Sequence, residues 1–153
     1  ARLRNLISEK IDVSPKNVHA YVVGEHGDSE FVPWSNATIG LQNIQNFLSA
    51  KEMDAIADEV KNAAYEIIKR KGATYYGIGM CLVRITNAIL GDENTIITVS
   101  TYDKDNDVYV GLPTVLNRNG ADKKIYITLN LEETNRLQKS IDLIRDAIAS
   151  IKK

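Results

Sequence analysis

The sequence has 153 residues, of which 44% are apolar and 25% are charged, and its formal net charge is −1. These values are ordinary for a single globular domain with a real core, here spanning 1–153. They give no electrostatic reason to expect nucleic acid or an anionic membrane as a partner. No apolar stretch approaches the roughly 20 residues that span a bilayer, and no signal peptide is visible.

The N-terminal third predicts a helix, a strand and a loop. Residues 2–10 have the pattern of the end of a helix, and Pro15 excludes its continuation. The β-branched and aromatic residues of 17–23 predict a strand. A loop bracketed by two glycines follows at 24–29, and residues 30–48 predict only short strands or irregular turns.

Two helices are expected next. Apolar residues recur at every third or fourth position over 50–70, which predicts an amphipathic helix. Gly72 ends this helix, and a second one is expected from about Ala73 to Leu90. Gly91 then provides a C-terminal stop.

The following segment predicts an antiparallel meander. The expected strands are 95–102, 107–110, 114–116 and 124–129. Short turn-rich connections between them favour antiparallel pairing. Strands and helices do not alternate as in a parallel βαβ sheet, so we expect one α+β domain with an antiparallel sheet packed against long helices.

The last helix has the clearest start. Asn130 is a good N-cap and Glu133, three residues on, completes a capping box. The helix carries an apolar stripe that we expect to be buried against this domain or another subunit. The stripe consists of Leu137, Ile141, Ile144, Ile148 and Ile151.

The single cysteine and the first residue allow two further expectations. Cys81 lies in the apolar run 80–83, so we expect a buried, unreactive thiol. One cysteine cannot form an internal disulfide, which fits a reducing, cytoplasmic setting. The chain starts at Ala1 inside an expected helix and without an initiator Met, so we expect its natural start to lie upstream.

Several residues could carry chemistry. Histidine has a reference pKa of about 6.5, so His26 in its Gly-bracketed loop could move a proton near neutral pH, although a solvated surface histidine is the alternative. His19 lies within the expected strand, where a structural histidine is favoured. Arg2 and Arg4 project differently from their helix and could serve two anions or be two solvated arginines. The Gly77–Gly79 pair lacks a third glycine and lies inside a helix, which argues against a dinucleotide loop.

Other types of site have little support in the sequence. No GxSxG elbow supports a Ser/His/Asp triad. No HxxxH or CxxC pair exists, and we expect no metal site.

Five segments together resemble the lactate and malate dehydrogenase family, in the family's order. GEHGDS at 24–29 resembles its catalytic-histidine segment, and ARLR at 1–4 resembles its substrate-arginine helix. The run YEIIKRKGATYYG at 65–77 resembles its pocket-lining segment. VGLP at 110–113 and LNRNG at 116–120 resemble its late β-hairpins. The resemblance covers essentially the whole chain and implies the fold of the family's C-terminal substrate domain, without the Rossmann domain that binds NAD.

The resemblance also implies catalytic and binding roles. His26 would be the acid/base that exchanges a proton with pyruvate or L-lactate while NAD(H) exchanges hydride. Arg2 would grip the substrate carboxylate through a planar, charge-assisted pair. Thr74 matches the pocket position at which lactate enzymes carry threonine, and Ile78 matches the apolar residue against the nicotinamide ring.

Regulation is implied by three other residues. Arg4 and His19 match the pair that binds fructose 1,6-bisphosphate across a subunit interface in allosteric bacterial enzymes, which implies a homotetramer. Tyr65 matches a tyrosine that is phosphorylated in related bacterial enzymes, but we expect it to act mainly as a buried helix tyrosine. One local departure is Val32-Pro33, where the family more commonly has proline first.

The resemblance places further parts of the active site upstream of this chain. These are the aspartate that orients the histidine, a mobile-loop arginine, the residue that selects lactate over malate, and the Gly-rich NAD fold. We therefore expect the chain alone neither to bind NADH nor to turn over. The alternatives are a malate or other L-2-hydroxy-acid dehydrogenase or, for the chain in isolation, a non-catalytic module for oligomerisation and effector binding.

Overall fold

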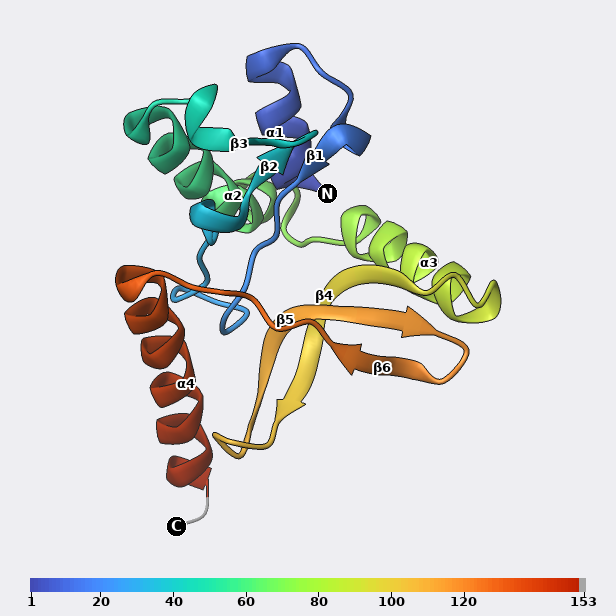
Figure 1. Ribbon diagram of the computed structural model, residues 1–153. Coiled ribbons are helices and arrows are strands. Elements are labelled where there is room, and N and C mark those ends of the chain that lie inside the picture. Colours follow the sequence, from blue (N-terminus) through green and yellow to red (C-terminus); the bar gives the residue numbers. More distant parts are fainter. Residues whose placement is uncertain (152–153) are drawn as a thin grey trace.

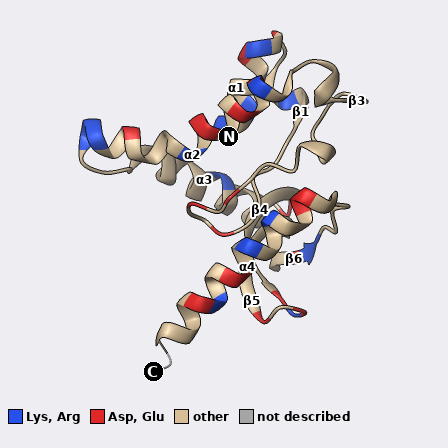
Figure 2. Ribbon diagram, turned by 90° about the vertical axis from the view of Figure 1, so that its left-hand side faces the viewer, with Lys and Arg blue, Asp and Glu red and all other residues tan. Residues whose placement is uncertain are grey.

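A computed structural model describes residues 1–151 and shows an α+β fold with four α-helices in the described chain (Figure 1). The helices are α1 (Arg2–Ile11), α2 (Ala50–Lys71), α3 (Tyr76–Leu90) and α4 (Leu131–Ile151). Within the described residues, none of the helices combines the length and apolarity needed to cross a membrane. Figure 2 shows acidic and basic residues interspersed along the α4 ribbon.

The first sheet is small and lies beside α1 and α2. It contains β1 (Val18–His19), β2 (Thr38–Ile39) and β3 (Gln42–Asn43), in that order and antiparallel. The short elements predicted for 30–48 are confirmed. Three short 3₁₀ turns complete the region: η1 (Pro15–Asn17), η2 (Trp34–Asn36) and η3 (Ile44–Asn46).

The strand predicted over 17–23 is wrong beyond its first residues. Only Val18–His19 belongs to a ladder, and Val23 pairs in an isolated bridge with Phe31. Val18 packs in one hydrophobic cluster and Val23 in another. The β-favouring composition therefore reflects a chain that crosses between two cores, because β propensity reports burial as much as pairing.

The second sheet is the antiparallel meander that the sequence predicts. Its order is β4 (Thr95–Asp103), β5 (Val108–Asn117) and β6 (Gly120–Lys124). The expected strands 107–110 and 114–116 are one continuous strand. The strand expected over 124–129 is wrong, since β6 ends where that strand was expected to begin.

The pairing of Pro113 explains why β5 continues through residues 111–113, where the sequence predicts a turn. Pro113 lies opposite Thr98 in the ladder with β4, and its carbonyl accepts a hydrogen bond from the Ile125 amide on the other side at 2.8 Å. The amide and carbonyl of a strand residue face the same neighbour. The missing N–H of Pro113 therefore faces the chain just past the end of β6, where the ladder has already stopped.

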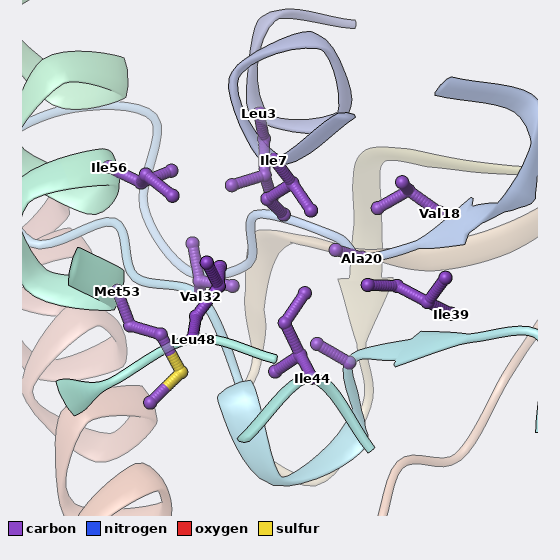
Figure 3. Packing of buried hydrophobic residues seen from close by; sticks show 11 residues of the cluster. Leu3, Ile7, Val18, Ala20, Val32, Ile39, Ile44, Leu48, Met53 and Ile56 are labelled. Atoms are coloured by element: carbon purple, nitrogen blue, oxygen red, sulfur yellow. The ribbon is translucent and has the colours of Figure 1, made fainter. Parts of the chain in front are cut away.

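One hydrophobic core joins α1, the small sheet and the start of α2 (Figure 3). Leu3 and Ile7 point down from α1 toward Val32 and Ile44, and Met53 and Ile56 of α2 approach from the side. A capping box between Ser49 and Glu52 starts α2. This core fixes α1, and with it the N-terminal arginines, against α2.

A second core lies where β5 meets α4. Its buried members are Val23, Phe31, Val108, Val110, Leu112 and Ile141. The predicted capping box of α4 is confirmed, because Glu133 and Asn130 exchange backbone-to-side-chain hydrogen bonds of 2.9 and 3.1 Å. The predicted stripe is buried only in its first part, since Ile148 and Ile151 are exposed.

The helix α3 differs from the sequence prediction at its start and in its burial. It begins at Tyr76 instead of Ala73, after Gly72 has closed α2 with a left-handed φ of 79°. Cys81 is exposed, so the expectation of a buried thiol is wrong. Apolar side chains of α3 face outward along its length, among them Met80 and Leu82.

Candidate functional site

The loop that carries His26 is fixed at its base by the backbone. Gly24 and Gly111 of β5 exchange two N–H···O hydrogen bonds of 2.9 Å each. Gly24 has a backbone φ of 104°, which residues other than glycine rarely adopt. A Cβ on Gly111 would lie 2.8 Å from the Gly24 carbonyl oxygen. Both glycines are thus required for this close approach.

A carboxylate holds the loop from within. The Oε2 atom of Glu25 accepts hydrogen bonds from the Ser29 hydroxyl at 2.6 Å and from the Ser29 amide at 3.2 Å. The same carboxylate lies against Gly27, where an added Cβ would come within 2.0 Å of Glu25 Oε1. The two neighbours of His26 in the chain are therefore in contact with each other.

The helix α4 holds the loop from outside at two points. Ser140 is completely buried and its hydroxyl lies 2.9 Å from the Ser29 hydroxyl and 3.0 Å from the Ser29 carbonyl oxygen. Seven residues earlier, Glu133 accepts hydrogen bonds from the Ser35 amide at 2.9 Å and from the Ser35 hydroxyl at 2.5 Å. Residues seven apart lie on one face of a helix. This face of α4 therefore contacts both the loop, at Ser29, and the chain that leaves it, at Ser35.

His26 itself projects into solvent. Its side chain is 99% exposed, and its Nδ1 atom lies 3.7 Å from Glu30 Oε2. Burial raises the pKa of Glu30, while the adjacent His26 works against that rise. The imidazole thus has one nearby carboxylate and an otherwise open surface.

Arg2 lies on the first turn of α1 and contacts α2. Its guanidinium donates a hydrogen bond to Glu59 Oε1 at 2.8 Å, and both side chains are about half exposed, at 49% and 53%. Arg4 does not join this pair. Its Nε donates to the Ala20 carbonyl at 3.5 Å, and its guanidinium lies 5.2 Å from the centroid of the Tyr21 ring. The expectation that the two arginines project in different directions is confirmed.

The middle of α2 links the Arg2 side to the His26 loop. Glu59 holds Arg2, whereas Lys61 Nζ and the Tyr65 hydroxyl lie 3.9 and 3.4 Å from Asp28 Oδ1 in the loop. Glu59 and Tyr65 are six residues apart, which is about 9 Å along a helix. Both segments therefore rest against one short stretch of α2.

A pocket of about 360 Å³ opens between the loop, α2 and α4. Asp28, Glu30, Lys61 and Lys139 contribute to its lining, but Arg2 and His26 do not. Across the described residues, no three His, Cys, Asp or Glu side chains gather into a metal-binding group.

The remaining candidates lie on separate surfaces. Thr74 is half-buried in the connection between α2 and α3, and Ile78 on the first turn of α3 is 51% exposed. His19 is exposed on β1, next to the Ala20 carbonyl that Arg4 contacts. Tyr65 is 59% exposed, so the expectation of a buried helix tyrosine is wrong.

Ser140 and Glu25 also belong to the site, and neither was predicted from the sequence. Ser140 precedes Ile141 on α4 and follows Leu137 by three positions, so it lies inside the apolar stripe. A small polar residue at the spacing of a buried stripe predicts a buried hydrogen bond, and that pattern could have identified Ser140. The carboxylate contact of Glu25 depends on loop geometry that the sequence does not display.

Comparisons with known proteins agree with this architecture. Residues 1–153 match the family described as lactate/malate dehydrogenase, alpha/beta C-terminal domain. The chain is 45% identical to L-lactate dehydrogenase 2 of Bacillus anthracis and 42% identical to L-lactate dehydrogenase 1 of Bacillus cereus, in both cases over 99% of this chain and 51% of the relative. The chain thus spans about half the length of the curated relatives it matches.

Solved structures give the same result. A lactate dehydrogenase enzyme from a Medee basin deep-sea metagenome library superposes with a TM-score of 0.93 at 45% identity, covering 99% of this chain and 52% of that one. The minor L-lactate dehydrogenase from Enterococcus mundtii gives a TM-score of 0.92 at 38% identity, over 98% and 51% of the two chains. This chain therefore belongs to the lactate/malate dehydrogenase family and has the fold of its alpha/beta C-terminal domain.

Proposed function

We propose that this chain is the substrate-binding half of an NAD-dependent L-lactate dehydrogenase, which interconverts pyruvate and L-lactate. The observation that carries the proposal is the presentation of His26. Its imidazole is almost fully exposed, yet its loop is fixed by β5, by Glu25 and by α4. A fixed loop with a free titratable tip suits proton exchange with a bound substrate.

His26 acts as the acid/base in this proposal. When protonated, it donates a proton to the keto oxygen of pyruvate; when neutral, it accepts the proton of the lactate hydroxyl. Glu30, with its carboxylate 3.7 Å from Nδ1, leaves Nε2 as the ring nitrogen that faces substrate. NAD supplies the hydride acceptor or donor when it is bound.

Arg2 binds the substrate carboxylate in this proposal. The guanidinium donates a hydrogen bond to the Glu59 carboxylate at 2.8 Å, and this contact supports the proposal that it binds a carboxylate on the side that faces α2. Guanidinium–carboxylate pairs are planar and fix orientation as well as adding affinity. The pair with Glu59 is half exposed and of low cost to exchange, since exposed pairs contribute about 0–1 kcal/mol.

Among the described residues, two would suit the nicotinamide end of NAD. Ile78 offers an exposed apolar surface on the first turn of α3, and Thr74 precedes it by four positions in the sequence. Gly77 and Gly79 lie within α3 and do not form a loop between a strand and a helix. We therefore propose that the diphosphate and adenosine are held by residues outside this chain, and that the chain alone neither binds NADH nor turns over.

Regulation by fructose 1,6-bisphosphate is the finer part of the proposal. Arg4 is held by the Ala20 carbonyl and by the Tyr21 ring, next to exposed His19. A bisphosphate shared by two such pairs would favour a homotetramer by neutralising their charges. Arg4→Ala or His19→Ala in the full-length protein should abolish bisphosphate activation and leave saturated turnover largely intact. Equal loss of both properties would contradict an effector role.

Tyr65 remains a proposed phosphorylation site. Its hydroxyl is accessible and lies 3.4 Å from Asp28 Oδ1. A phosphate there would repel Asp28 and push away the loop that carries His26. Mass spectrometry of the protein purified from its native cells would detect the modification.

The catalytic proposal is tested in the full-length protein. His26→Gln should lower kcat by about two to four orders of magnitude, as expected for loss of an acid/base group. Lys16→Gln, an exposed position in η1, is the control and should leave kcat unchanged. Near-normal turnover in His26→Gln would remove His26 from the mechanism.

Two further measurements define substrate and binding. Arg2→Lys should raise KM for pyruvate by about tenfold or more through loss of the bidentate pair, whereas the exposed Arg118→Lys should not. Comparing pyruvate, oxaloacetate and 2-oxoisocaproate distinguishes a lactate enzyme from a malate or branched 2-hydroxy-acid enzyme. An NADH fluorescence titration of the isolated chain that gave micromolar affinity would contradict the assignment of NAD binding to residues outside it.

A further inference from the structure

We propose that Ser140 of α4 is a positioning residue for His26, acting through Ser29 and Glu25. This inference rests on the proposed function, because it concerns the acid/base of that same site. It identifies a buried hydroxyl, 114 positions after His26 in the chain, as a determinant of how the imidazole is presented.

Counting protons gives the network a direction. The Ser29 hydroxyl has one proton, and its shortest contact is the 2.6 Å bond to Glu25 Oε2, which accepts it. The Ser29 oxygen is then left as an acceptor for the Ser140 hydroxyl at 2.9 Å. The single proton of Ser140 is thus directed at Ser29, between its hydroxyl and carbonyl oxygens. The chain of donors runs from α4 to Ser29 and then to Glu25.

The network ends at the two residues that flank His26. The Glu25 carboxylate lies against Gly27, and the Gly27 amide donates to the Glu25 carbonyl at 2.9 Å. Moving this carboxylate therefore moves the backbone on both sides of His26. Ser29 binds the Glu25 carboxylate through both its amide and its hydroxyl. The hydroxyl contact depends on the rotamer of Ser29, so that rotamer controls the position of the Glu25 carboxylate.

Ser140 is shielded from solvent. Its side chain is completely buried, and its Oγ atom would lie 2.6 Å from a Cβ added at Gly24. The hydroxyl therefore occupies the space that the missing Gly24 side chain leaves open. The helix face that carries Ser140 is also fixed at Glu133 and Ile141, so the hydroxyl is held by a rigid element.

The test uses four variants of the full-length enzyme: Ser140→Ala, Ser29→Ala, the double variant, and Ser150→Ala as control. Ser150 lies on the same helix but is exposed, and among the described residues its hydroxyl bonds only to the Ala147 carbonyl of α4 at 2.7 Å. Each variant is measured for kcat, for KM with pyruvate and for its thermal midpoint.

Loss of positioning should appear in kcat. We expect Ser140→Ala and Ser29→Ala each to lower kcat about tenfold, because small displacements of a reacting group cost one to two orders of magnitude. KM for pyruvate should change by less than about twofold, since Arg2 is untouched. The kcat of the double variant should be close to that of the worse single variant. It should not fall by the product of the two single effects, about 100-fold, because both residues act along one path.

Three outcomes would overturn the inference. They are an unchanged kcat in Ser140→Ala even if its thermal midpoint falls, an additive double variant, or an unchanged kcat in Ser29→Ala. The last measurement decides the matter if Ser140→Ala does not fold. His26→Gln is measured in parallel: if it loses turnover while the serine variants keep theirs, only this inference fails, and if it keeps turnover, the proposed function fails with it.

Discussion

The loop around His26 and the segment that begins α3 contribute different parts of the proposed site, and the structure holds them in different ways. The His26 loop is fixed by backbone bonds to β5 and by side-chain bonds to α4. The start of α3 has no side-chain cap at Tyr75, and Tyr76 and Ile78 are exposed. Within the described residues, the proposed proton-transfer part of the site is built by this chain's own packing.

The two regions differ in how closely their residues pack against neighbouring elements. Changes near the His26 loop meet close neighbours. In contrast, an added Cβ at Gly77 or Gly79 in α3 would have no described atom within 4 Å beyond the adjacent helix backbone. Substitutions of the same chemical kind should therefore have different effects in the two regions. Four predictions make this comparison, each measured by urea denaturation of this chain with far-UV circular dichroism.

The largest effect is expected beneath the loop. Ile141→Ala removes a side chain that is buried against Val23 and Phe31, and it should lower the free energy of unfolding by about 3 kcal/mol through lost burial and a new cavity. Leu82→Ala in α3 removes a side chain that is mostly exposed and should cost less than about 1 kcal/mol. Equal losses would contradict the comparison.

A glycine in the loop should be nearly as sensitive. Gly24→Ala combines a left-handed φ with a Cβ 2.6 Å from Ser140 Oγ, and we expect a loss of about 2 to 3 kcal/mol. Gly40→Ala separates the two causes, because Gly40 has φ of 58° but nothing within 4 Å. Its cost should be about 1 kcal/mol, for backbone strain alone. A Gly24 variant no worse than the Gly40 variant would show that Ser140 yields easily.

The sheet beneath the loop should give a pH-dependent effect. Burial opposes ionisation of Asp103, but hydrogen bonds from Lys124 and Asn106 outweigh it and lower the pKa of Asp103. A lowered folded-state pKa stabilises the protein above the unfolded value, near 3.8, and that stabilisation disappears as the pH falls through the folded-state pKa. Asp103→Asn should cost about 2 kcal/mol at pH 7.

The pH series provides the control for this prediction. The difference between wild type and Asp103→Asn should begin to shrink below pH 4, where Asp103 binds a proton in the unfolded chain, and should disappear as the pH falls through the lowered folded-state pKa. Asp146→Asn, at an exposed position on α4, should show little difference at either pH. A difference that stayed constant from pH 7 to pH 3 would mean that the charge of Asp103 is not what stabilises the sheet.

The smallest effect should have the opposite sign. Gly77→Ala in α3 replaces a poor helix former where space is open, and it should stabilise the chain by about 1 kcal/mol. The thermal midpoint would then rise by about 2 to 4 °C for a chain of this size. A fall in the midpoint would show that Gly77 is closely packed after all.

Helices with strong periodicity and clear caps could be predicted from the amino-acid order alone. The helix predicted over 50–70 and the Asn130–Glu133 start of α4 are confirmed, because capping and apolar spacing are local properties of the chain. The segment GEHGDS also indicated the family, which the comparisons show. Features that depend only on residues close together in the sequence can be predicted without knowing the fold.

Features that depend on distant neighbours could be known only from the folded chain. Pro113 continues β5 because β6 has ended beside it, and residues 20–23 leave their strand because they cross between two cores. Ser140 becomes part of the His26 site because α4 packs across the loop. Each of these outcomes follows from which surfaces meet, and burial and hydrogen bonding between residues far apart in the chain are set by packing and not by local propensity.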